Sequence, residues 1–192
     1  QESMEEEDLI RYGRGAMYEN RKRSGMSTPP VTGESSLKYF LDRLSDAKQG
    51  PYDEHILLVH NVCLLQSDID AAKDVMKNVY WAVCPLSNLF IHNALPPIPL
   101  MRENDLKVVV GTDSLSSNDD LDMVKELYCL HENFPEVPMN ELLEWVCSNG
   151  AEFLDRKELG SIAVGKRPGI VLVSNVDETG NLTAESRSER II

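Results

Sequence analysis

Unbroken apolar runs alternate along the chain with segments in which apolar residues recur at helical spacing. The unbroken runs cover residues 56–59, 80–83 and 108–110. Runs without alternation are typical of strands that are buried on both faces of a sheet. The helical spacing is found at residues 37–44, 68–78, 96–103, 123–130 and 138–147. Strands that alternate with helices predict βα units around a parallel sheet, and therefore an α/β fold.

The pattern changes after residue 155. Residues 160–166 have glycine near both ends and predict a β turn between strands, and residues 170–173 predict a strand. The tail is polar from Asp177 onward, and its last two residues, both isoleucine, could close a final strand. We therefore expect a chain organised as residues 1–155 and residues 156–192.

Residues 11–33 contain glycines and prolines at a density that marks a long loop. A loop of this length is often a functional lid, and simple disorder is the equal alternative. Its arginines could meet an anionic or carbonyl group of a substrate, or form a solvated basic surface; they are Arg11, Arg14, Arg21 and Arg23.

Charge and composition exclude several classes of partner. The chain has 192 residues, a hydrophobic fraction of 42% and a net charge of −13. A surface this acidic repels phosphate backbones and anionic lipid. We therefore expect neither nucleic acid nor membrane as a partner. No apolar run approaches the ~20 residues that a membrane span needs. The four cysteines form no CxxC pair, which predicts reduced, mostly buried thiols and a cytoplasmic location.

Polar side chains follow each of the three apolar runs. His60 comes directly after the first run, Ser87 and Asn88 after the second, and Asp113 after the third. In a parallel βα barrel, the carboxyl ends of the strands form the face that carries the active site. The spacing therefore predicts that these groups meet at one mouth.

Each of these residues also has a simpler interpretation. His60 could be a core histidine bonded to a neighbouring carbonyl group, Asp113 could cap the helix that follows, and Asn88 could hold a turn. His55 and His131 are predicted to be structural or at the surface, because they lie at a strand start and late in a helix.

A series of short motifs runs from Cys84 to Lys166. They are Cys84-Pro85-Leu86-Ser87-Asn88, Leu95-Pro96-Pro97-Ile98-Pro99-Leu100, Gly111-Thr112-Asp113-Ser114, Ser117-Asn118, Leu121-Asp122-Met123, Asn149-Gly150-Ala151, Leu159-Gly160-Ser161-Ile162 and Gly165-Lys166. In this order they resemble the cytosine-deaminase-like and chlorohydrolase-like branch of the amidohydrolase superfamily. The resemblance implies a (β/α)8 TIM-type barrel with a small β-sandwich. Residues 1–155 would be the C-terminal half of that barrel, and residues 156–192 part of the sandwich.

The same resemblance implies roles for five residues. Asp113 would bind a divalent metal, zinc or alternatively iron, and accept a proton from the metal-bound water. Glu2 would shuttle protons, and His60 would contact the substrate or the attacking water. Asn88 and Ser114 would line the substrate site. A divalent ion lowers the pKa of bound water toward ~7, and carboxylates nearby can move its proton to a leaving amine.

The His-x-His that supplies two metal ligands in this family is absent from the sequence. One clear ligand, Asp113, does not make a tight site, and a half barrel leaves strand edges exposed. The chain also opens on Gln1 rather than methionine, which suggests a cleaved or truncated product. We therefore expect it to pair with an N-terminal half of the same protein; a homo-oligomer stays open.

The predicted function is hydrolytic deamination of an aminated, purine-like or pyrimidine-like heterocycle, a small-molecule substrate; C–Cl or amide hydrolysis by the same site is a close variant. The alternative is a non-catalytic fragment or degenerate homologue that packs against an N-terminal partner chain. A third interpretation is a small doubly wound α/β binding protein with accidental motif matches.

Overall fold

The computed structural model describes residues 3–47 and 50–192. The chain divides into two compact units, which meet in sequence between Val79 and Tyr80. The first unit contains α1 (Met4–Glu7), the π-helix η1 (Asp8–Tyr12), α2 (Gly15–Arg23), α3 (Ser36–Ala47), β1 (Tyr52–Val59) and α4 (Gln66–Val75). Strand β2 (Met76–Val83) continues from the first unit into the second.

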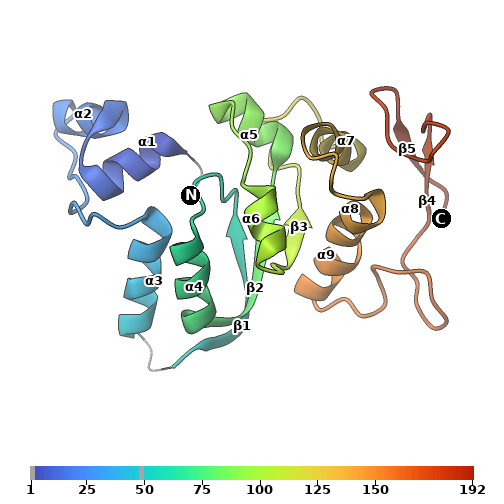
Figure 1. Cartoon of the computed structure of the whole chain (residues 1–192), viewed down its shortest axis with the longest axis horizontal. Helices are drawn as coiled ribbons and strands as arrows, with labels where there is room; N and C mark the ends of the chain where they lie inside the picture. The colour runs from blue at the N-terminus through green and yellow to red at the C-terminus, as the bar shows by residue number, and fades with distance from the viewer. Residues whose placement is uncertain (1–2, 48–49) are drawn as a thin grey trace. The chain divides into compact units, whose positions relative to one another are not determined.

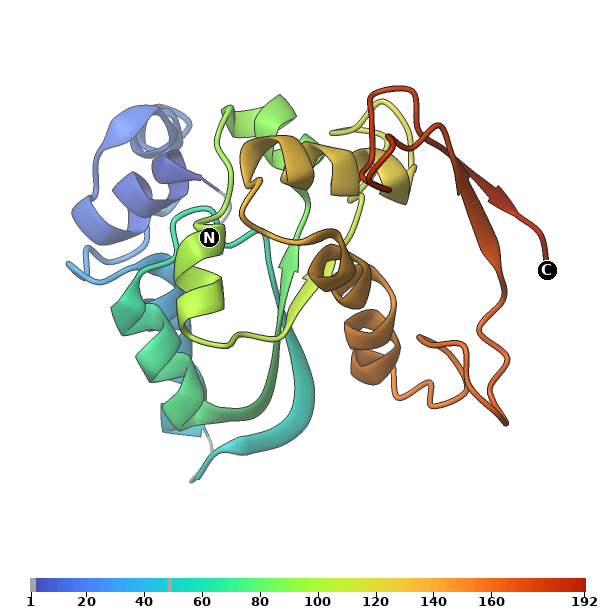
Figure 2. The ribbon, with the colours of Figure 1, turned by 45° about the vertical axis from the view of Figure 1, so that its right-hand side comes forward.

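Helices α3 and α4 form the packed part of the first unit. Leu37 and Leu41 are the buried residues of α3, and Ile69 and Ala72 are buried on α4. Residues three or four apart lie on one face of a helix, so each pair makes an apolar stripe. The two helices lie side by side in both views of the ribbon (Figures 1 and 2).

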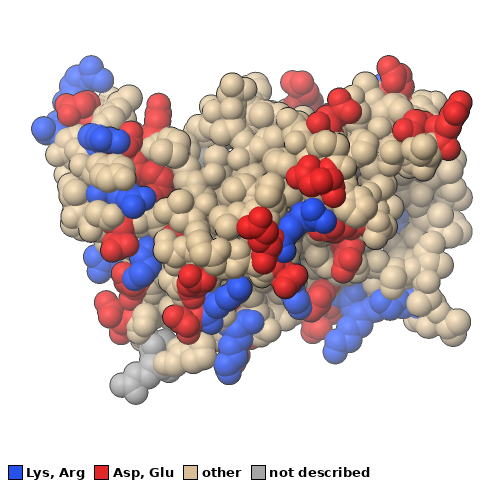
Figure 3. Space-filling view, in the orientation of Figure 1, with Lys and Arg blue, Asp and Glu red and all other residues tan. Residues whose placement is uncertain are grey.

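The prediction of a loop over residues 11–33 was wrong for residues 15–23, which form α2. This helix has no buried residue, so it shows no apolar periodicity by which the sequence could have revealed it. It is stabilised locally by good helix formers and by three basic residues in its last turn, Arg21, Lys22 and Arg23, which suit the negative end of the helix dipole. Lys and Arg side chains gather over α2 in Figure 3.

The second unit contains, after β2, α5 (Pro85–His92), α6 (Ile98–Glu103), β3 (Val108–Val110), α7 (Met123–Asn133), α8 (Met139–Val146), α9 (Ser148–Phe153), β4 (Val171–Ser174) and β5 (Arg187–Arg190). Strand order in the larger sheet is β1-β2-β3. Strands β2 and β3 are parallel, with Trp81 opposite Val108 and Val83 opposite Val110. The predicted α/β class and the three predicted strands are therefore confirmed.

The core of the second unit comes from β2, β3 and the helices beside them. Trp81 and Val83 are buried on β2, Met101 on α6, and Leu130 and Leu142 on α7 and α8. Because both faces of these strands are covered, their sequences are unbroken apolar runs.

Two predicted helices end differently in the structure. The helix predicted over residues 68–78 ends at Val75, and β2 begins at Met76. The helix predicted over residues 138–147 is followed directly by a second helix, α9, which was not predicted. Helix α8 stops at Val146, and the chain then turns at Cys147 and forms α9.

Strands β4 and β5 form a separate two-stranded antiparallel sheet, in which Val171 faces Arg190 and Ser174 faces Arg187. The strand predicted at residues 170–173 is confirmed one residue later. The last two residues lie beyond β5, although Ile170 and Ile192 still share a backbone hydrogen bond of 3.2 Å. The boundary at residues 155 and 156, and the cytoplasmic location, stay predictions.

Among the described residues, no helix is both long and apolar enough to cross a lipid bilayer. The four cysteines are free thiols, as predicted. Burial raises the pKa of Cys84 to about 12 and of Cys129 to about 11, so neither is a ready nucleophile.

Candidate active site

Asp113 lies three residues beyond β3. The N–H of Gly111 donates to the carbonyl oxygen of Val83 at 3.0 Å, which continues the pairing of β3 with β2 past the end of the strand. Asp113 then takes a left-handed backbone conformation with φ of 59°. Its side chain is exposed, while the residues that hold it are buried.

Two buried hydroxyl groups hold the Asp113 carboxylate. The Oγ atoms of Ser87 and Ser117 each lie 2.8 Å from Asp113 Oδ2 and 2.9 Å from one another. These three oxygens share two hydroxyl protons. A charged carboxylate is stabilised most when both hydroxyl groups donate to it. Ser87 is completely buried and Ser117 is 5% exposed.

A second layer of hydrogen bonds lies behind the two serines. Glu126 on α7 is completely buried, and it accepts from the N–H of Leu86 at 3.0 Å and from Asn118 Nδ2 at 2.6 Å. Asn118 Nδ2 also donates to the carbonyl oxygen of Thr112 at 2.9 Å. Burial raises the pKa of Glu126, and its two N–H donors partly oppose that rise.

The simpler interpretation of Asn88, that it holds a turn, is wrong because Asn88 lies inside a helix. Ser87 and Asn88 belong to α5, which begins at Pro85 directly after the end of β2. Proline suits the first helical position because the N–H that it lacks would have no helical partner there. Asn88 is completely buried and its N–H donates to the carbonyl oxygen of Cys84 at 2.9 Å.

The structure places Ser114 and Asn88 in different surroundings. Ser114 is exposed, and its Oγ lies 2.5 Å from the Oγ of Ser116. The roles of Ser114 and Asn88 in substrate binding stay predictions.

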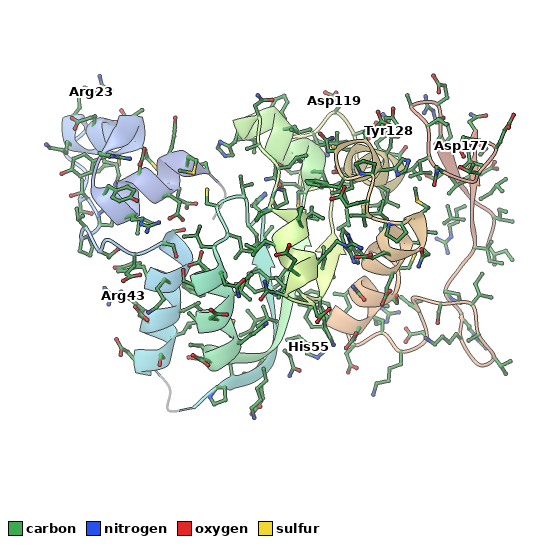
Figure 4. The ribbon with its side chains drawn as sticks, in the orientation of Figure 1. Arg23, Arg43, His55, Asp119, Tyr128 and Asp177 are labelled. Atoms are coloured by element: carbon green, nitrogen blue, oxygen red, sulfur yellow. The ribbon has the colours of Figure 1, made fainter. Side chains whose placement is uncertain are left out.

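His60 directly follows the end of β1 in the first unit. His60 and Asn61 are both left-handed, with φ of 70° and 57°. Asn61 is buried and its Nδ2 donates to the carbonyl oxygen of Leu58 at 2.8 Å. Left-handed residues other than glycine are uncommon and gather at functional sites, so the strand end at His60 is a candidate for function. His55, labelled in Figure 4, projects from β1 before its end.

Glu2 lies outside the described residues, and its role stays a prediction. The helix that follows it, α1, is capped by Ser3, which accepts from the N–H of Glu6. Glu7 is buried at the end of α1 and accepts from both the N–H and the hydroxyl of Ser36, at 3.1 and 2.5 Å. Glu7 thereby joins α1 to the start of α3.

Sequence reasoning missed Glu126, although a signal for it was present. Met123, Leu127 and Leu130 mark the apolar face of the predicted helix, and Glu126 falls on the same face by its spacing. An acidic residue on a buried face needs hydrogen-bond donors, which makes it a candidate for a structural or functional network.

Among residues 3–47 and 50–192, no three His, Cys, Asp or Glu side chains form a group that could hold a metal ion. Zinc in proteins takes three or four protein ligands. The described residues therefore do not by themselves fit a zinc site, although the carboxylate of Asp113 is of the right ligand type.

Comparison with known proteins assigns the chain to a family. The model of the amidohydrolase family matches residues 36–189. The 5-methylthioadenosine/S-adenosylhomocysteine deaminase of Caldanaerobacter subterraneus subsp. tengcongensis is 29% identical over 149 residues, which are 73% of this chain and 34% of that protein. The chain thus spans about a third of the length of the curated relatives that it matches.

Solved structures agree with this assignment. Helicobacter pylori aminofutalosine deaminase is 26% identical and superimposes with a TM-score of 0.72, over 88% of this chain and 41% of that one. An adenosine deaminase from Xanthomonas campestris with bound zinc is 24% identical with a TM-score of 0.55, over 81% of this chain and 38% of that one, and it supports the fold. The chain therefore belongs to the amidohydrolase family.

Proposed function

We propose that the chain is the C-terminal part of an amidohydrolase that hydrolytically deaminates an adenosine-like compound. The proposal is supported by the relatives and the structural neighbour named as deaminases of methylthioadenosine, S-adenosylhomocysteine and aminofutalosine. The observation that carries it is the carboxylate of Asp113, held by the hydroxyls of Ser87 and Ser117 just beyond β3.

Residues 1–155 would form the late strands and helices of a (β/α)8 barrel, and residues 156–192 part of a β-sandwich. The three-stranded sheet and the partial coverage of longer structures support this organisation. An N-terminal half of the same protein would supply the remaining strands. At the carboxyl ends of such strands, loops assemble the active site of a barrel enzyme.

Deamination exchanges an amino group for a hydroxyl group, so a proton must leave the attacking water and ammonia must leave the ring carbon. Asp113 is the proposed acceptor of the water proton, and Glu2 the proposed donor to the leaving amine. The two serine hydroxyls orient Asp113 by their hydrogen bonds to its Oδ2 atom. His60, Asn88 and Ser114 are proposed to contact the substrate.

A divalent metal is part of the proposal, with zinc preferred because an adenosine deaminase of similar fold was solved with bound zinc. Asp113 would be one of its ligands. The others would have to come from the N-terminal half, because no group of metal ligands occurs among the described residues.

The test is deamination by the protein that joins this chain to its N-terminal half. Adenosine, 5′-deoxyadenosine and 5′-methylthioadenosine are supplied in turn, and ammonia release is measured. Asp113→Asn should lower kcat/KM by ~10²–10⁴-fold, because it removes the acid–base group. Asp105→Asn is the matched control, because the backbone of Asp105 is also left-handed, with φ of 52°. This variant should retain wild-type kcat/KM.

Wild-type kcat/KM in Asp113→Asn would refute the role of Asp113. Absence of ammonia release from every adenosine-like compound would favour the alternative, a non-catalytic chain that packs against a partner. The observation that favours this alternative is that no group of side chains that could hold a metal ion occurs among the described residues.

A further inference from the structure

We infer that Glu126 is a positioning residue, which sets the orientation of Asp113 by fixing the two segments that carry Ser87 and Ser117. The inference rests on the proposed function in one respect, that Asp113 is the reactive carboxylate. Among the described contacts, Glu126 makes no hydrogen bond to Asp113. It acts through Leu86 and Asn118, which are the sequence neighbours of Ser87 and Ser117.

The geometry places each contact of Glu126 next to a contact of Asp113. One oxygen, Oε2, accepts from the N–H of Leu86, the residue before Ser87. The other, Oε1, accepts from Asn118, the residue after Ser117. Both serines donate to the same oxygen of Asp113. A shift of either segment against Glu126 therefore moves a hydroxyl that holds Asp113.

Asn118 extends this connection to the backbone of the reactive loop. Its Nδ2 carries two hydrogens, one of which is directed to Glu126 and the other to the carbonyl oxygen of Thr112, directly before Asp113. Thus Glu126 is connected to Asp113 by three short routes, through α5, through Ser117 and through Thr112. We call the set of Glu126, Leu86 and Asn118 the clamp.

A carboxylate is the side chain that this place requires. Both groups facing Glu126 are N–H donors, so both of its terminal atoms must accept. A glutamine of the same shape has one acceptor oxygen and one donating amide, and it must turn the amide toward one of the two donors.

Kinetics of the joined protein test the clamp. Glu126→Gln should lower kcat by ~10–100-fold, the usual effect of removing a partner that orients an active-site ligand, with KM nearly unchanged. Glu141→Gln is the matched control. It makes the same carboxylate-to-amide change on α8, where Glu141 pairs with Arg102 at 2.8 Å, and it should keep wild-type kcat. A Glu126→Gln enzyme with wild-type kcat would overturn the inference.

A double-mutant cycle separates positioning from general destabilisation. If Glu126 acts through Ser117, adding Ser117→Ala to Glu126→Gln should lower kcat little further than the more damaging single change. Adding Ser117→Ala to Glu141→Gln should multiply the separate effects. Independent, fully multiplicative losses for Glu126 and Ser117 would contradict the clamp.

Amide hydrogen exchange tests the clamp without any reaction. In Glu126→Gln, peptides covering residues 84–92 and 111–118 should both exchange faster, while in Glu141→Gln they should be protected as in the wild type. Faster exchange confined to α7 would overturn the inference. If the wild-type protein deaminates none of the compounds, the proposed function fails, and the exchange result still decides whether the clamp exists.

Discussion

At the scale of single residues, the site contrasts an exposed carboxylate with a buried one. Asp113 is exposed and takes two hydroxyl hydrogen bonds, whereas Glu126 is completely buried and takes two N–H hydrogen bonds. Asp113 was predicted from the sequence because it follows an apolar run. Glu126 was not, although its spacing places it on the apolar face of α7, because its partner Leu86 lies 40 residues earlier in the sequence.

Several groups influence the ionisation of Glu126. Burial is the main cause of its raised pKa, and the negative charges of Asp120 and Asp113 add to the rise. The thiols of Cys84 and Cys129 also lie near it, and the charge of Glu126 contributes to their own raised pKa values.

We predict a specific dependence of stability on pH from Glu126. Its pKa is higher in the folded chain than the ordinary 4.5, so the folded chain binds more protons than the unfolded chain between those two values. The stability contributed by Glu126 is therefore complete below pH 4.5 and is lost as the pH rises through the raised value. The free energy of unfolding of wild type minus that of Glu126→Gln should fall across this window.

Urea unfolding of the two proteins over a pH series that begins below 4.5 and ends near neutrality measures this difference. A difference that grows with pH would mean that the N–H donors outweigh burial and lower the pKa of Glu126.

At the scale of elements, the strands of the larger sheet and the well-packed helices were predictable, whereas α2 at the surface and α5 at the site are examples of helices that were not. The apolar runs of β2 and β3 are buried, whereas β1 is largely exposed, and α3 shows a stripe because one face is buried. Helix α2 buries no residue, so its sequence carries no such signal. Helix α5 begins at Cys84-Pro85, which in a single sequence is equally typical of a turn.

The start of α7 matters because this helix carries Glu126. Asp122 is the N-cap of α7, and its side chain accepts from the N–H of Val124 at 2.9 Å. We predict that Asp122→Ala lowers the free energy of unfolding by about 1 kcal/mol, the usual cost of losing such a cap. The control is Asp119→Ala, because Asp119 is exposed in the loop before α7 (Figure 4). Thermal or urea unfolding measures both variants.

Equal destabilisation by Asp122→Ala and Asp119→Ala would show that the loss of an acidic charge near the helix start, and not the loss of the cap, controls the stability of α7.

At the scale of the whole molecule, the family and the fold class can be predicted from this sequence, whereas the full set of active-site residues cannot. The order of the motifs around Asn88 and Asp113 is enough for the family, which the match over residues 36–189 confirms. The metal ligands could not be completed from this chain, because a barrel site gathers side chains from strands far apart in the sequence. Glu2, His60 and Asp113 therefore stay a proposed set.

Crystallography of the zinc-loaded protein, with this chain joined to its N-terminal half, tests the central claim most directly through the anomalous signal of zinc. The account predicts a zinc ion about 2 Å from a carboxylate oxygen of Asp113, with the imidazole of His60 on the same side of the barrel. Zinc bound without Asp113 as a ligand, or His60 and Asp113 at opposite ends of the barrel, would contradict it.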